Sequence, residues 1–191
     1  DGTSRGFNLV GNPYPSYLKW SEFMAETANA EAVLNSFWFR TKNNSNQYAF
    51  TTYNGTSHEV VGGSAIPTAL NEFIPPMQAF WVRVKENAGK TTYSTSITFK
   101  NNMRKHADAI GNSSDNRLKV QSENQRTRLR LQLANATAAD ETLLYFDAKA
   151  VNSFDDYDSP KMMNNTAAIP DLYTKAGSER LVINGMNAIA D

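Results

Sequence analysis

The sequence contains no cysteine, only two histidines and no long apolar run. Without cysteine, disulfides, thiol nucleophiles and thiolate metal ligands are excluded. No stretch approaches the roughly 20 apolar residues that a membrane-spanning helix needs, so we expect no membrane insertion. Lysine plus arginine balance aspartate plus glutamate at 19 each. Because there is no surplus positive charge to attract a polyanion, we expect no nucleic-acid partner.

Sequence signatures of catalytic sites are also missing. His58 and His106 lie in polar segments, and neither has the neighbouring nucleophile and acid of a catalytic triad. The sequence has no Gly-x-Ser-x-Gly, no phosphate-binding glycine loop and no His-Glu-x-x-His. We therefore predict that the chain is not an enzyme. A glycoside hydrolase stays open as an alternative, because its two carboxylates can be remote in sequence. The candidate carboxylates are Glu22, Glu59, Glu72 and Glu141.

Alternation of apolar and polar residues with a period of two predicts an all-β protein. Phe80 and Val82 alternate with Trp81 and Arg83, as in a strand with one buried and one wetter face. A second such strand spans residues 128–133, where arginine or glutamine alternates with leucine. We expect antiparallel sheets packed as a β-sandwich or in a jelly-roll-like manner.

Two further features of the sequence bear on its organisation. Good helix formers and a capping Ser21 predict a short helical insertion near residues 17–34. A polar, turn-rich stretch at 105–124 resembles a linker or long loop. The sequence therefore predicts a first β unit over 1–104, which carries the helical insertion, and a second over 125–191. The two units either fold separately or share one core.

Three residues are candidates for contact with a ligand: Trp81, Arg83 and Tyr48. Trp81 shares its strand face with Arg83, so this aromatic ring is expected on the wetter side of the sheet. Tyr48 is a second aromatic residue that could stack on a sugar ring, because a flat ring offers apolar area with a polar rim. Packing in the core is the alternative use of such residues.

An acidic run suggests the one candidate metal site. Asp155, Asp156 and Asp158 could offer hard oxygen ligands to calcium, although the glycine and terminal glutamate of an EF-hand are absent. A solvated acidic turn, with Lys161 nearby to balance its charge, is the alternative. We expect a structural role for calcium if it binds, and no other cofactor.

Several longer motifs carry a family resemblance. They are Gly-Phe-Asn-Leu-Val-Gly-Asn-Pro-Tyr-Pro-Ser at 6–16, Phe-Trp-Phe-Arg at 37–40 and Ile-Pro-Pro-Met-Gln-Ala-Phe-Trp-Val at 74–82. Together they resemble a segment near the C-terminal ends of large surface and secreted proteins of the Bacteroidetes. The run from Arg128 to Phe146 and the following residues 154–161 are similar to the region that precedes a type IX secretion sorting domain in such proteins.

The resemblance implies an exported β module, located outside the cell or on its outer surface. Such modules accompany adhesin, protease or glycan-degrading domains, and the resemblance assigns no catalytic residue to this chain. The expected function is adhesion, binding or structural presentation of neighbouring domains. The expected partners are other domains of the parent chain, and a glycan or a host or cell-surface protein; a carbohydrate-binding module is the alternative. The resemblance also implies that further strands and the sorting domain follow Asp191.

Overall fold

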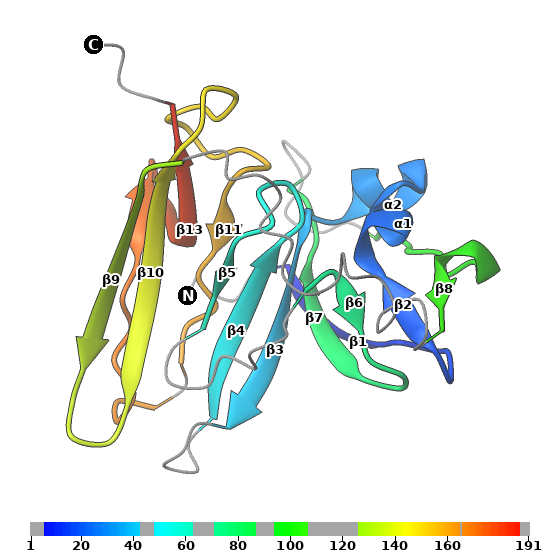
Figure 1. The fold of residues 1–191 in the computed structure, drawn as a ribbon, viewed down its shortest axis with the longest axis horizontal. Coiled ribbons are helices and arrows are strands. Elements are labelled where there is room, and N and C mark those ends of the chain that lie inside the picture. Colours follow the sequence, from blue (N-terminus) through cyan, green and yellow to red (C-terminus); the bar gives the residue numbers. More distant parts are fainter. Residues whose placement is uncertain are drawn as a thin grey trace. The chain divides into compact units, whose positions relative to one another are not determined.

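The computed structural model describes residues 6–42, 48–62, 71–86, 94–106, 126–164 and 166–187 (Figure 1). The chain divides into two compact units, and each unit is assembled from separated stretches of sequence. The unit that we call the sandwich unit comprises Asp1–Arg5, Asn35–Asn71 and Arg126–Asp191. The unit that we call the helical unit comprises Gly6–Leu34 and Glu72–Gln125.

The sandwich unit contains two sheets. Its strands are β3 (Ser36–Lys42), β4 (Tyr48–Asn54), β5 (Val60–Val61), β9 (Arg128–Ala134), β10 (Ala139–Phe146), β11 (Ser159–Pro160), β12 (Thr174–Ala176) and β13 (Glu179–Met186). In one sheet, β4 lies between β3 and β5. In the other, the strand order is β11-β13-β10-β9, with β12 also paired to β13. Figure 1 shows β9 next to β10 at the margin of this second sheet.

The core of the sandwich unit lies between its two sheets. Val61 from β5 packs with Leu143 and Tyr145 from β10 and with Val182 and Ile183 from β13, and all five side chains are buried. These residues come from strands far apart in the sequence, so burying them joins the two sheets.

One strand pair in the sandwich unit departs from antiparallel pairing. β10 and β13 run parallel, with Leu143 opposite Ile183 and Leu144 opposite Asn184. Parallel neighbours need a long connection between them. Here that connection carries β11 and β12, and both of these strands pair antiparallel with β13.

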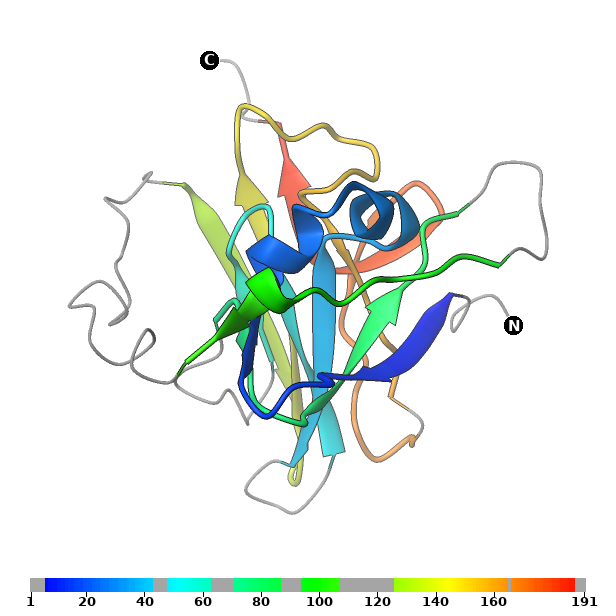
Figure 2. The ribbon, with the colours of Figure 1, turned by 90° about the vertical axis from the view of Figure 1, so that its right-hand side faces the viewer.

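The helical unit contains the short helices α1 (Trp20–Met24) and α2 (Thr27–Ala32) and a set of short strands. These strands are β1 (Phe7–Gly11), β2 (Tyr17–Lys19), β6 (Phe73–Ile74), β7 (Ala79–Arg83) and β8 (Arg104–Lys105), and a 3-10 helix, η2, spans Asn101–Met103. β1 pairs with β7, and β2 lies between β6 and β8; all three pairings are antiparallel. Figure 2 shows η2 in green beside α1 in blue.

Aromatic side chains form much of the core of the helical unit. Trp20 is buried, and its ring stacks on Phe23 with centroids 4.9 Å apart. Phe80 from β7 contacts Trp20 edge-on at 6.2 Å. Helices of this length are marginal alone, so packing of these rings stabilises them.

The buried side chain of Asn12 links two of the motifs that carry the family resemblance. Its amide nitrogen donates hydrogen bonds to the carbonyls of Ser16 at 2.9 Å, Pro75 at 2.9 Å and Ile74 at 3.2 Å. Its oxygen accepts the backbone N–H of Tyr14 at 3.0 Å. Residues 12–16 and 74–75 therefore form one structural feature, held by a single buried amide.

The predicted fold class is confirmed: the chain is mostly β, sandwich-like, with two short helices inside residues 17–34. The predicted division into 1–104 and 125–191 is linear, whereas each compact unit combines separated stretches. The predicted linker at 105–124 lies, apart from Lys105 and His106, outside the described residues. Within the described residues, no helix is both long enough and apolar enough to cross a bilayer.

Candidate interaction surface

The titratable residues that the sequence offered for catalysis occur in both units. His58 and His106 are both exposed, and Nδ1 of His58 lies 2.8 Å from the Tyr53 hydroxyl. Each of the four candidate carboxylates forms an ion pair with a basic side chain. The pairs are Glu22 with Lys105, Glu59 with Arg128, Glu72 with Lys19, and Glu141 with Arg130.

The acidic loop uses its carboxylates to bind its own backbone. Asp155 accepts the N–H groups of Val151 at 2.9 Å and Tyr157 at 2.8 Å. Asp158 accepts the N–H groups of Asp155 at 3.0 Å and Gly185 at 2.9 Å. Within the described part of the chain, no three His, Cys, Asp or Glu residues are grouped so that they could hold a metal ion. The calcium prediction for Asp155, Asp156 and Asp158 therefore gains no support.

The alternative of a solvated acidic turn is wrong for Asp158. Asp158 is only 3% exposed. Burial raises the pKa of its carboxyl to about 7, and the negative charge of Asp155 adds to the shift, while the hydrogen bonds from the Asp155 and Gly185 N–H groups oppose it. Lys161 does not balance this loop, because it pairs with Asp140 instead.

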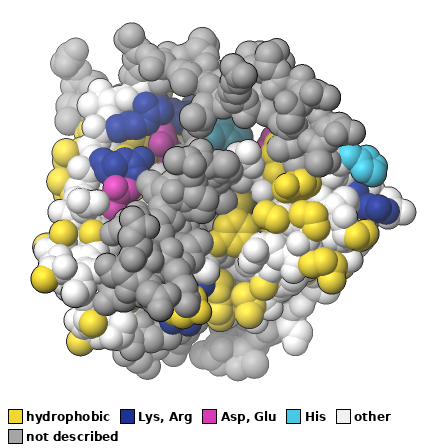
Figure 3. Space-filling model, turned by 60° about the horizontal axis from the view of Figure 1, so that its bottom comes forward, with side chains coloured by type: hydrophobic (Ala, Val, Ile, Leu, Met, Phe, Trp, Pro, Cys, Tyr) yellow, Lys and Arg dark blue, Asp and Glu magenta, His cyan; other side chains and the backbone are white. Residues whose placement is uncertain are grey.

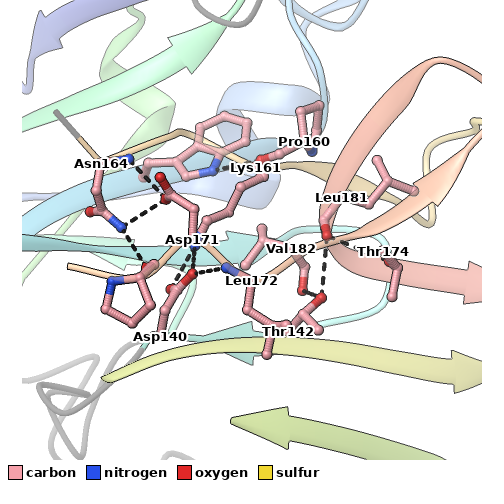
Figure 4. Close-up of polar contacts among 12 residues, drawn as sticks. Asp140, Thr142, Pro160, Lys161, Asn164, Asp171, Leu172, Thr174, Leu181 and Val182 are labelled. Carbon is pink, nitrogen blue, oxygen red and sulfur yellow. Dashed lines mark hydrogen bonds and ion pairs between the residues drawn. The ribbon is translucent and has the colours of Figure 1, made fainter. Parts of the chain in front are cut away.

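The Lys161–Asp140 pair is an internal element of the sandwich unit (Figure 4). Nζ of Lys161 lies 2.6 Å from Oδ1 of Asp140, and both side chains are almost fully buried. Oδ2 of the same carboxylate accepts the backbone N–H of Leu172 at 2.6 Å. The pair thereby connects β10, the residue after β11 and the segment before β12, and we assign it a structural role.

Trp81 and Arg83 lie on one face of β7 in the helical unit, as the alternation predicted. Trp81 is half-buried and sits opposite Leu9 of β1, which is 56% exposed. Arg83 sits opposite Phe7, and its guanidinium lies 5.6 Å from the centre of that ring. Contrary to the expectation of a wetter face, Arg83 is buried. Leu9 and Phe7 of β1 therefore lie beside Trp81 and Arg83 on this face and add apolar side chains to it.

Tyr48 belongs to β4 of the sandwich unit. It is 48% exposed, and the guanidinium of Arg40 lies 5.0 Å from the centre of its ring. Trp20 and Trp38 are buried, and Nε1 of Trp38 donates to the Pro160 carbonyl at 3.2 Å. Of the three tryptophans, Trp81 alone retains a partly exposed ring.

β9 is a strongly exposed strand of the sandwich unit. All seven of its residues are exposed, and the leucines at 129, 131 and 133 are 50%, 43% and 47% exposed. In soluble proteins, a strand with alternating leucines normally turns them toward a core. Here Leu143 and Tyr145, the core residues of β10, lie opposite Arg130 and Arg128. The arginines of β9 therefore share the core-facing side, and its leucines share the outer side.

The inward arginines are held by buried carboxylates of the same unit. Nε of Arg128 lies 2.8 Å from Oε1 of Glu59, and Arg130 pairs with Glu141 and donates to the Val60 carbonyl at 3.2 Å. Glu59 and Glu141 are each 7% exposed. Figure 3 shows basic side chains directly beside acidic ones, at the upper left, with hydrophobic side chains at the left margin. These pairs prevent β9 from rotating its leucines inward without burying unpaired charge.

β9 is paired along one edge, and hydrogen bonds at its two ends define which groups face the other edge. The N–H of Phe146 donates to the Thr127 carbonyl at 3.1 Å, and the N–H of Asn135 donates to the Ala138 carbonyl at 2.8 Å. Because backbone direction alternates along a strand, the odd-numbered residues between them point their N–H and C=O groups at β10. The same groups of Arg128, Arg130, Gln132 and Ala134 therefore point at the other edge, where the described residues place no strand.

Sequence reasoning found the alternation in β9 but missed this surface. Period-two alternation separates two faces without saying which one is covered. A usable signal was present, because the polar positions hold two arginines, which can reach buried carboxylates through long side chains.

The described residues form a mostly β, sandwich-like fold, in which β9 lies at one end of the strand order of its sheet. Over residues 2–190, the chain matches the family described as a domain of unknown function (DUF8693), and it belongs to that family. Comparison with curated proteins found no match, and neither did comparison with solved structures.

Proposed function

We propose that this chain is a non-catalytic binding module of an exported bacterial protein, located outside the cell or on its outer surface. The observation that carries the proposal is β9, a strand whose seven residues are all exposed and whose outer side is a row of leucines. The resemblance to surface and secreted proteins of the Bacteroidetes supports the location. In this proposal, β9 binds an extended segment of a neighbouring domain or of another protein.

Physical chemistry favours β9 as a site for strand addition. An exposed edge presents unpaired N–H and C=O groups, and proteins usually protect such edges with charge, proline or a covering segment. β9 has no proline, and its arginines point to the core-facing side, where carboxylates bind them. An added strand would pair with the edge groups and cover part of three leucines, each worth about 1.5–3 kcal/mol when fully buried.

The absence of a catalytic role is supported by the ion pairs of the four candidate glutamates. Each of Glu22, Glu59, Glu72 and Glu141 has a lysine or arginine within 4 Å. Breaking such a pair to free a carboxylate for acid–base chemistry would cost energy, most of all at the buried Glu59 and Glu141.

A second candidate function is carbohydrate binding at the β1–β7 face. Trp81 lies opposite the exposed Leu9, and Arg83 lies opposite Phe7, so an aromatic ring, apolar area and a cation share one face. A sugar ring could stack on the partly exposed Trp81.

The proposal predicts that β9 accepts a foreign strand. We expect a short fluorescein-labelled peptide, in which leucine alternates with threonine, to bind saturably in fluorescence anisotropy. Gln132→Pro is expected to weaken binding by at least about tenfold, equivalent to about 1.4 kcal/mol, because proline removes an edge-facing N–H. Gln132→Ala is the matched control and keeps that N–H. Pairing with β10 should survive in both variants, since residue 132 points its backbone groups away from β10.

The same samples distinguish the two candidate functions. Peptide binding that is insensitive to Gln132→Pro would contradict strand addition at β9. Absence of peptide binding, together with a saturable glycan-induced shift of tryptophan fluorescence, would favour the carbohydrate-binding alternative. Circular dichroism of each variant establishes that the fold is retained.

A further inference from the structure

The sequence of β9 is nearly self-complementary about its centre. The strand runs Arg-Leu-Arg-Leu-Gln-Leu-Ala, and Leu131 is the middle residue. We propose that the occupant of the β9 edge is a second copy of this chain, whose β9 pairs antiparallel with the first across a two-fold axis at Leu131. The proposal rests on the proposed function, because it requires that the edge of β9 binds a strand.

The backbone groups along the edges of the two copies of β9 match one another. The edge-facing residues of β9 are the even-numbered ones from Arg128 to Ala134. A two-fold axis at Leu131 places Arg130 opposite Gln132 of the second copy, and Arg128 opposite Ala134. Every residue in these pairs is edge-facing, so each pair can exchange both of its N–H···O=C bonds. This register covers the full length of β9 and satisfies all of its edge-facing groups.

The leucines of the two copies of β9 also lie opposite one another. In this register Leu131 lies opposite Leu131 of the second copy, and Leu129 lies opposite Leu133. These are the non-hydrogen-bonded positions, where Cα atoms of an antiparallel pair approach to about 4.5 Å and side chains lie closest. The exposed leucines of both copies therefore form cross-strand pairs on one side of the joined sheet.

The charges on β9 also favour an axis at Leu131. An axis at Arg130 would place this arginine opposite its own copy, and like charges directly opposite are destabilising. An axis at Leu131 places glutamine or alanine opposite each arginine. Arg128 and Arg130 are also neutralised within their own unit by Glu59 and Glu141, and the chain has no net charge. The two copies can therefore approach without a repulsive field.

The absence of cysteine permits a direct test of the register. Leu131→Cys places one thiol at the axis, where the Cα separation of about 4.5 Å falls within the range of about 4.4–6.8 Å that disulfides require. Position 129 lies opposite 133, so two cysteines at 129 are separated by about four residues, or roughly 14 Å. Leu129→Cys is therefore the matched control, since both leucines are exposed to a similar extent.

Under mild oxidation, we expect Leu131→Cys to form the disulfide-linked dimer at least about tenfold faster than Leu129→Cys, because the geometry is met at position 131 alone. A mixture of Leu129→Cys and Leu133→Cys should form the mixed dimer faster than either variant alone. Adding Gln132→Pro to Leu131→Cys should abolish the difference, because it removes an edge N–H from each copy. Sedimentation equilibrium of the unmodified chain should show a concentration-dependent dimer.

Equal rates of cross-linking at positions 129 and 131 would overturn the proposal, as would a chain that stays monomeric at all concentrations. If the alternating leucine–threonine peptide still binds in either case, the proposed function stands and its natural partner is a strand of a different protein or domain. If the peptide also fails to bind, both proposals fail.

Discussion

Lys161→Met is expected to lower the free energy of unfolding by about 3–5 kcal/mol, the usual cost of leaving a buried charge without its partner. The Asp140 carboxylate would then retain only the N–H of Leu172 within the surroundings that Figure 4 shows. Urea unfolding followed by tryptophan fluorescence measures the change. Lys149→Met is the matched control, because Lys149 is exposed, and it should shift stability by no more than about 0.5 kcal/mol.

A second variant separates loss of charge balance from loss of packing. Adding Asp140→Asn to Lys161→Met removes the uncompensated charge and keeps an oxygen that can accept the Leu172 N–H. We expect the double variant to be more stable than Lys161→Met alone. If Lys161→Met costs no more than Lys149→Met, the pair is not buried as the structure describes.

Asp158 is expected to make the sandwich unit less stable as the pH rises from about 4 to about 7, because its pKa rises from 3.8 to about 7 on folding. The folded protein holds the proton more tightly than the unfolded chain. The stabilisation is therefore complete below about pH 4 and is lost as the pH approaches 7. At about 1.4 kcal/mol per pKa unit, the loss is on the order of 3–4 kcal/mol.

Asp158→Asn tests this pH dependence. Asparagine stays neutral. Its single amide oxygen can accept the N–H of either Asp155 or Gly185, because these two groups bond to different oxygens of the Asp158 carboxyl. Relative to the native chain, the variant should therefore become more stable as the pH rises from 4 to 7. Asp156→Asn, in the exposed part of the same loop, is the matched control variant. A stability difference between Asp158→Asn and the native chain that stays constant over this range would contradict the burial of the Asp158 carboxyl.

Local features of the fold could be predicted because they follow from local rules. Alternation along 80–83 and 128–133 predicted strands β7 and β9, and good helix formers after Ser16 predicted the helices α1 and α2. The parallel pairing of β10 with β13 could not be predicted in this way. It depends on contacts between residues far apart in the chain, and neither periodicity nor turn residues encode such contacts.

The candidate site was less predictable than the fold, because burial depends on which face of a strand the rest of the chain covers. Trp81 was predicted on the wetter face, and it is half-buried there, whereas Arg83 on the same face is buried. Asp158 looked like part of a solvated turn, yet it is enclosed beside β13. The leucines of β9 look like core residues in sequence, and they are exposed. In each case long-range packing overrides residue type.

The measurement that tests the central claim most directly is amide hydrogen exchange along β9, followed residue by residue by NMR. In dilute protein, the account predicts fast exchange at the even-numbered positions from Arg128 to Ala134 and slow exchange at Leu129, Leu131 and Leu133, whose N–H groups face β10. Equal protection of both sets in dilute protein would mean that the edge of β9 is already covered, and it would contradict the account.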